Sequence, residues 1–275
     1  METHSARALA LSAGIASEAR GTGDRRFRAQ AVYPRAGGAM MRRTTLPSWK
    51  VLPMNAVLHP LLAVAYAALL GRGLAIRRNG APAGLSLMLL AVTAALLWDN
   101  LVLSAGAWVR ASETFERVHM TRFWLHACVT PLLVPVSYAF VRLSGAAWAR
   151  RPAAALAVLL ATAGLIVLEL AASATRLDLK PVFEHGILTY EPAGRSAAGA
   201  VMIAAVMAAL LAAGWIVFRR GGSPAPLAGA LAMLLGGALA PLAGVPSLHN
   251  LFEWILAASL WSAAGRLAAR AHRGL

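Results

Sequence analysis

The sequence predicts an all-α fold, a polytopic transmembrane helix bundle, and three observations support this prediction. The chain has 275 residues, of which 59% are apolar and only 13% are charged, whereas soluble domains carry about 25% charged residues. From Val51 onward the apolar residues gather into seven stretches of roughly 18 to 23 residues, the length of a helix that crosses a ~30 Å hydrocarbon core. Most of the charges lie between these stretches. We therefore expect an integral, multi-pass membrane protein.

The first and third stretches carry features that modify this prediction. The first contains Asn55, His59 and two prolines, so a re-entrant segment that leaves six true spans is the alternative. The third contains Pro131 and Pro135, which predict a kink because proline removes a helical hydrogen bond. The expected spans are approximately residues 51–70, 83–104, 122–143, 152–174, 197–218, 225–243 and 246–267.

Residues 1–50 differ from the rest of the chain. They hold nine basic and three acidic residues among Gly, Ser and Ala, without a helical or strand period. We expect a disordered Arg/Ala/Gly-rich tail over residues 1–50 and a transmembrane helical domain over residues 51–275. A biological start at Met40, Met41 or Met54 is the alternative.

The net charge of +15 has two interpretations. In a soluble protein it would suggest nucleic acid, but here the arginines flank apolar spans, so we expect the lipid bilayer as partner and no nucleic acid. The loops after spans one, three and five, with the C-terminal tail, hold eleven basic residues and no acid, while the other three loops hold six basic and five acidic residues. The positive-inside rule then places the C-terminus in the cytoplasm and, with seven spans, the N-terminus outside the cell membrane. The sequence does not predict the oligomeric state.

Polar residues inside the expected spans share one depth. A charged side chain at the membrane centre costs at least about 2.5–3.5 kcal/mol of insertion free energy, so we expect each of these residues to have a structural partner or a function. Counted along each helix from the loops, all of them fall in the outer third of the bilayer. We expect one polar site that is open to the outer leaflet. Its members are Asp99, Asn100, His126, Glu169, His249, Asn250 and Glu253.

Helical spacing groups some of these residues. His249 and Glu253 are four positions apart and share a helix face. A second stripe, in the third span, follows the same three-four spacing and leads from the outer loop into the membrane: His119, Arg122, His126 and Thr130. The loop over residues 175–196 lies above this site, where it acts either as a lid or as an ordinary solvated loop. A structural role for each residue, such as an ion pair between Asp99 and Arg122, is the alternative to a functional site.

The first functional hypothesis is a metal-assisted hydrolase that modifies a lipid. His126, His249, Asp99 and Glu253 are nitrogen and oxygen ligands of the types that zinc accepts. Glu169 would then be the general base for a metal-bound water. Asn100 and Asn250 would contact the metal or the lipidic substrate.

The span count and this set of residues resemble the seven-helix membrane hydrolases that include alkaline ceramidases and adiponectin-type receptors. Those proteins bind their metal through three histidines, with an H-x-x-x-H pair in the last span. Here His249 and Glu253 stand at that spacing. The resemblance implies a zinc-dependent hydrolase.

Two other hypotheses stay open. A metal-free acid–base enzyme would use Glu169 or Asp99 to protonate a prenyl or polyene lipid, because a carboxylic acid in low dielectric can hold its proton at neutral pH. A small-molecule or proton-coupled transporter or binding protein would use the same buried groups as a relay. No phosphate-binding glycine loop is present, so the sequence does not support an ATP-driven function.

Overall fold

The computed structural model describes residues 54–174, 177–194, 196–243, 245 and 247–272. The chain divides into two units, Met1–Leu46 and Pro47–Leu275, and every described residue belongs to the second. The tail expected over residues 1–50 lies outside the described residues.

The described part of the chain is predominantly helical, as the sequence predicts. Five helical segments are long and apolar enough to cross a membrane by length and composition: α1, α2, the rod that joins α3 to α4, α5 with its continuation, and α6. These segments are consistent with a multi-pass membrane protein, and seven as the number of spans stays a prediction. The helices are α1 (Met54–Arg78), α2 (Ala83–Ala105), α3 (Glu113–Val129), α4 (Leu133–Leu143), α5 (Pro152–Glu169), α6 (Ala197–Arg219), α7 (Ala225–Ala243) and α8 (Leu248–His272).

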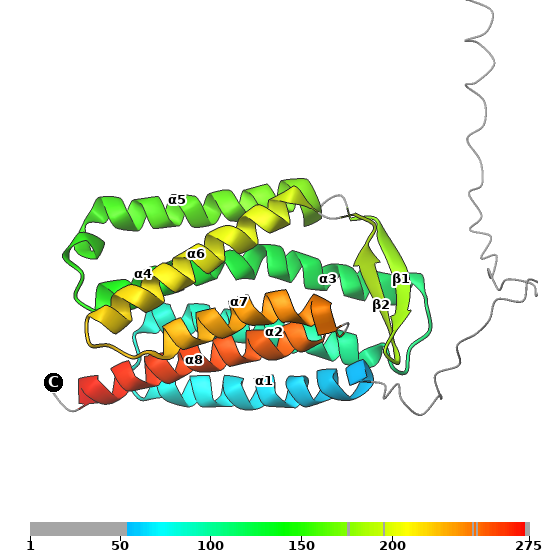
Figure 1. Cartoon of the computed structure of the whole chain (residues 1–275), viewed down its shortest axis with the longest axis horizontal. Helices are drawn as coiled ribbons and strands as arrows, with labels where there is room; N and C mark the ends of the chain where they lie inside the picture. The colour runs from blue at the N-terminus through cyan, green and yellow to red at the C-terminus, as the bar shows by residue number, and fades with distance from the viewer. Residues whose placement is uncertain (1–53, 175–176, 195, 244, 246, 273–275) are drawn as a thin grey trace, which may run out of the picture. The chain divides into compact units, whose positions relative to one another are not determined.

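The core lies where α1, α2 and α8 meet. In Figure 1, α1 runs beside α2 and α8, α7 lies between α6 and α8, and α5 forms the opposite edge of the bundle. Trp261 of α8 is fully buried, and its indole nitrogen donates a 2.9 Å hydrogen bond to the hydroxyl of Thr93 in α2. Tyr66 of α1 is also fully buried. Most leucines of α5, in contrast, are exposed, as expected for a helix that faces lipid: Leu156, Leu159, Leu160 and Leu168.

A short break separates α3 from α4 at the kink that the prolines predict. Thr130–Leu132 form a 3₁₀ turn, and α4 begins at Leu133. Pro131 has no N–H to continue the α-helical ladder. The break begins at Thr130, the last residue of the polar stripe of α3, so the α-helical ladder is interrupted beside the expected site.

The loop after α5 is a β-hairpin, which departs from the expected all-α fold. β1 (Leu179–Glu184) pairs antiparallel with β2 (Ile187–Pro192). His185 and Gly186 join them with φ values of 49° and 88°. Positive φ at both positions is the signature of the two-residue turns that match strand twist. The hairpin signal is therefore local, in a His-Gly turn between two short alternating segments.

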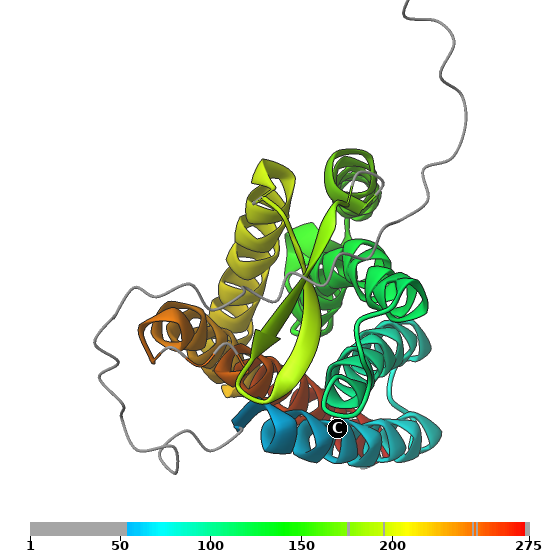
Figure 2. The ribbon, with the colours of Figure 1, turned by 90° about the vertical axis from the view of Figure 1, so that its right-hand side faces the viewer.

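The hairpin docks on the neighbouring ends of α2 and α3, across the helix ends in Figure 2. The backbone N–H of Leu188 donates to the carbonyl of Gly106 at 2.9 Å, and a Cβ at position 106 would clash with the carbonyl oxygen of Leu188. The hydroxyl of Tyr190 donates to the carbonyl of Ser112 at 3.1 Å and accepts from its N–H. Because these contacts hold β2 in place, the segment is a packed cap and not a solvated loop.

The topology of these helices can be tested by cysteine labelling. We expect a cysteine at Glu184, in the hairpin, to react with an impermeant maleimide on intact cells, and a cysteine at Arg150, between α4 and α5, to be protected. Both variants carry Cys128→Ser, which removes the single native thiol. We expect this result because Arg150 lies in one of the loops that hold basic and no acidic residues, which the positive-inside rule places in the cytoplasm. Permeabilised cells, in which both positions should react, are the control. If Arg150→Cys reacted on intact cells and Glu184→Cys did not, the orientation in the membrane would be the reverse of the one predicted.

Candidate functional site

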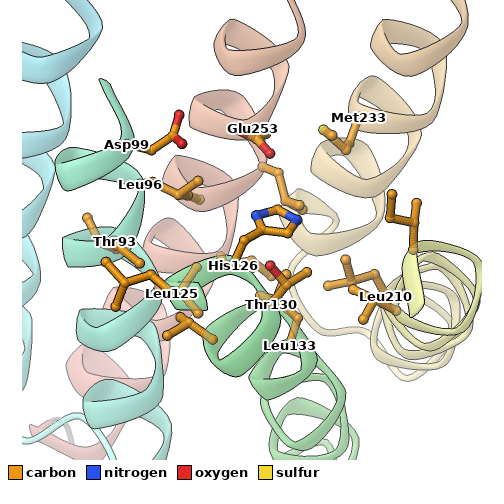
Figure 3. A pocket seen from close by; sticks show the side chains of 18 of the residues that line it. Thr93, Leu96, Asp99, Leu125, His126, Thr130, Leu133, Leu210, Met233 and Glu253 are labelled. Carbon is orange, nitrogen blue, oxygen red and sulfur yellow. The ribbon is translucent and has the colours of Figure 1, made fainter. Parts of the chain in front are cut away.

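A cavity of about 110 Å³ lies between α2, the α3–α4 rod, α6, α7 and α8. Figure 3 shows Asp99 and Glu253 toward one end, His126 projecting into the middle, and Leu133 and Leu210 toward the other end. The wall is otherwise mostly apolar. The cavity therefore has a polar end and an apolar end. Its polar and charged lining residues are Thr93, Asp99, Arg122, His126, Thr130, His249 and Glu253.

Asp99 is held by two side chains from two other helices. Its Oδ1 accepts a 2.8 Å hydrogen bond from Nε of Arg122 in α3, which completes an ion pair. Its Oδ2 accepts a 3.2 Å hydrogen bond from Nδ2 of Asn250 in α8. The side chains of Arg122 and Asp99 are 14% and 24% exposed, respectively. Both carboxylate oxygens are thus engaged within the protein.

Arg122 also joins this ion pair to the hairpin through His119. Its Nη1 lies 2.9 Å from Nδ1 of His119. A guanidinium group can only donate, so this Nδ1 must accept, and the ring of His119 is neutral with its proton on Nε2. The ring is fully buried and packs edge-on against Phe115, with 4.6 Å between ring centroids. On its other side lies Tyr190 of β2, at 5.4 Å. A continuous row of contacts therefore runs from Asp99 to the hairpin.

His126 lies one turn further into the membrane than Arg122. Its ring projects into the cavity (Figure 3), and no hydrogen bond within the described residues holds it. Thr130 lies one turn further again on the same stripe and also lines the cavity. The ring of His126 is accordingly the group in the middle of the cavity that stays available to a bound molecule.

His249 and Glu253 face the cavity from the first two turns of α8. Nε2 of His249 lies 3.6 Å from Oε1 of Glu253, as their four-residue spacing predicts. The Glu253 side chain is 15% exposed and that of His249 is 45% exposed. This separation is an ion-pair contact and is too long for a hydrogen bond, and the histidine is the more accessible partner.

Two residues expected at the site lie elsewhere. Asn100 follows Asp99 directly, but successive residues of a helix point about 100° apart. It is fully buried against α1, where its Oδ1 accepts a 3.1 Å hydrogen bond from Nδ1 of His59. Glu169 ends α5 and packs near Gly199 of α6, outside the cavity lining. The structure thus brings Asp99, His126, His249, Asn250 and Glu253 together and separates Asn100 and Glu169 from them.

Two contributors carry no sequence signal that singles them out. Thr93 lines the cavity and its hydroxyl accepts a hydrogen bond from the buried Trp261, but nothing in the sequence distinguishes it from Thr162, which also lies in an apolar stretch. Tyr190 reaches His119 only because the hairpin folds over α3. The stripe of His119, Arg122 and His126 was the signal that did predict the α3 side of the site.

The described residues contain no group of three or more His, Cys, Asp or Glu side chains placed to hold a metal ion. Asp99, expected as a zinc ligand, already binds Arg122 and Asn250. His126, His249 and Glu253 are the remaining potential ligands around the cavity. Zinc binding stays a prediction.

Comparison with known proteins adds no assignment. No protein-family model, no curated protein sequence and no solved structure matches this chain. The function must therefore be argued from the cavity itself.

We expect the Asp99–Arg122 pair to show strong thermodynamic coupling. Arg122→Gln should lower the free energy of unfolding by about 3 kcal/mol, because it leaves a carboxylate unpaired in a low-dielectric environment. The double variant Asp99→Asn/Arg122→Gln should recover much of that loss, since neither charge remains. Thermal unfolding of the wild type, Asp99→Asn, Arg122→Gln and the double variant in one detergent completes the double-mutant cycle. Arg117→Gln is the control, because Arg117 pairs with Glu113 at an exposed position of the same helix. Additive losses in the cycle would contradict the coupling.

Proposed function

We propose that this membrane protein is an enzyme that binds an amphipathic lipid in the cavity and transfers protons at the polar group of that lipid. The observation that carries the proposal is the distribution of groups along one cavity, with Asp99 and Glu253 toward a polar end, His126 in the middle and an apolar far end. A ligand that combines a polar group with a hydrocarbon part matches both ends.

The size of the cavity supports a lipid whose chain extends beyond it. A volume of about 110 Å³ is small beside the roughly 300–1,000 Å³ of pockets that enclose a whole small-molecule ligand. Ile203 of α6 lines the cavity and is 52% exposed, so this wall reaches the outer surface of the bundle. The reacting group can therefore sit among the histidines while its chain leaves along α6 into the bilayer.

The chemistry follows from which polar groups remain available. Asp99 is engaged by Arg122 and Asn250, which suits a positioning residue. His126 is free of hydrogen bonds within the described residues, and His249 lies beside Glu253. Histidine accepts and donates protons near neutral pH, and a carboxylate beside it can supply or take the proton. These three residues are our proposed acid–base groups, in place of the catalytic roles expected for Glu169 and Asp99.

Lipid binding can be tested by photo-crosslinking in native nanodiscs. We expect a diazirine analogue of farnesol to label residues that line the cavity, in particular Ile203 and Met207 of α6. Met207→Trp should reduce this labelling at least about fivefold, because the larger ring fills the path along α6. Val201→Trp is the matched control, since Val201 is on the same helix, 53% exposed, and outside the lining. Equal labelling of cavity residues and of Leu160, on the lipid-facing side of α5, would contradict a specific site.

Catalysis can be tested by lipidomics of membranes from cells that produce the protein. We expect a change in at least one lipid species with the wild-type chain and not with Glu253→Gln or His126→Ala. General acid–base catalysis contributes about 10²–10⁴-fold to a rate, so either variant should remove the change. Leu160→Ala, at a lipid-facing position, should behave as the wild type. If the lipid profile were the same for the wild type and Glu253→Gln while crosslinking stayed specific, the enzyme hypothesis would be refuted. A binding or transport protein would then be the remaining hypothesis.

A further inference from the structure

A second and larger cavity, of about 290 Å³, lies at the opposite end of the bundle. It is formed by the end of α4, the α6–α7 loop and the last turns of α8, the region at the left of Figure 1 near the C-terminus. Two guanidinium groups line it, those of Arg220 and Arg266, together with the hydroxyl of Ser223. Phe140, Leu143 and Leu267 supply an apolar wall beside them. The function proposed above uses none of these residues.

The positive charge of this cavity has no counterion within the described part of the chain. Neither Arg220 nor Arg266 belongs to a salt bridge there. The acidic residues of the helices and the hairpin all lie toward the hairpin end: Asp99, Glu113, Glu116, Glu169, Asp178, Glu184, Glu191 and Glu253. Two arginines that share a cavity without a carboxylate favour an anion as the missing partner.

The loop that carries Arg220 and Ser223 is held in a defined conformation. Gly221 has a φ of +70°, and the N–H of Gly222 donates to the carbonyl of Val217 at 2.9 Å. A Cβ at Gly222 would meet Val217 side-chain and carbonyl atoms at 2.7 and 2.8 Å, so the close turn requires glycine. The backbone between Arg220 and Ser223 therefore has a defined turn conformation.

Ser223 retains a donor for such an anion. Its Oγ accepts from Arg266 and, at 3.1 Å, from the N–H of Ala225 at the start of α7. Within the described residues its hydroxyl proton is not donated to any acceptor. Arg266 is thus positioned at the cavity by Ser223, while the hydroxyl proton and both guanidinium groups remain able to bind oxygen atoms.

The surrounding aromatics indicate that this cavity lies at the depth of lipid headgroups. Trp215 is 53% exposed, and the guanidinium of Arg219 lies 5.7 Å from the centroid of its ring. Trp148 is 48% exposed near the end of α4. Tryptophan and arginine at helix ends are typical of the membrane interface, where an apolar wall next to a cationic site fits an acyl chain next to a phosphate.

We propose that this cavity binds the phosphate of an anionic phospholipid, with Arg220 and Arg266 as charged ligands and Ser223 as a neutral donor. Arginine matches the geometry of phosphate oxygens and can bind two of them at once. The hydrocarbon wall of Phe140, Leu143 and Leu267 favours a lipid over free phosphate. The positive-inside rule would place this lipid in the cytoplasmic leaflet.

Native mass spectrometry of the whole chain in detergent tests the proposal. Three probes are compared at equal concentrations: phosphatidylglycerol, phosphatidylcholine with the same acyl chains, and inorganic phosphate. We expect saturable binding of phosphatidylglycerol that Arg220→Ala/Arg266→Ala weakens at least about tenfold, because the double variant removes both charge-assisted hydrogen-bond donors. Arg77→Ala/Arg78→Ala removes the same charge from exposed positions at the end of α1 and should keep the affinity.

A second variant guards against loss of folding. Arg220→Gln leaves the Arg266–Ser223 hydrogen bond in place, so it should melt like the wild type and still bind phosphatidylglycerol several-fold more weakly. Equal binding of phosphatidylglycerol and phosphatidylcholine would overturn the proposal. So would an equal loss in the Arg77/Arg78 control, which would show a diffuse charge effect. Inorganic phosphate that binds as tightly as the lipid would overturn the assignment to phospholipid.

Discussion

The ion pair between Asp99 and Arg122 determines the arrangement of the polar end of the bundle. A carboxylate that faced hydrocarbon alone would cost at least about 2.5–3.5 kcal/mol, so the helices must provide partners. Arg122 of α3 and Asn250 of α8 occupy its two oxygens, and three helices are thereby fixed around one group. Replacement of such a pair by apolar residues is often neutral or stabilising, whereas removal of one partner alone is strongly destabilising.

This arrangement also separates structural polar groups from available ones. Arg122 binds Asp99 and His119, and His119 contacts the hairpin, so the charges of Asp99 and Arg122 are paired within the protein. Nε2 of His119 is buried without a hydrogen-bond partner among the described residues. His126 is on the same stripe of α3 but one turn deeper, and no such partner reaches it among the described residues. The proposed acid–base groups, His126, His249 and Glu253, are therefore the titratable residues of the cavity that do not belong to the Asp99–Arg122–His119 network.

Much of the fold could be predicted from the sequence, while side-chain neighbours could not. Apolar run lengths predicted the helical segments, and two prolines predicted the break after α3, because both are local properties. Asp99 and Asn100 share a depth, but only the packing of α1 against α2 shows that they face different helices. Glu169 has the depth of the site but belongs to α5, at the edge of the bundle, and depth carries no information on lateral position. The hairpin depends on a two-residue turn within a segment whose apolar content is low.

The placement of His249, Asn250 and Glu253 in α8 has a consequence for biosynthesis. During synthesis α2 and α3 leave the ribosome before α8, so Asp99 and Arg122 can pair as soon as these two helices are in the membrane. Leu188 of the hairpin reaches Gly106 only after α5 has been made. The last described helix then delivers the second histidine and the carboxylate to His126. The proposed acid–base groups can thus come together only after α8 has been synthesised, later than the hairpin.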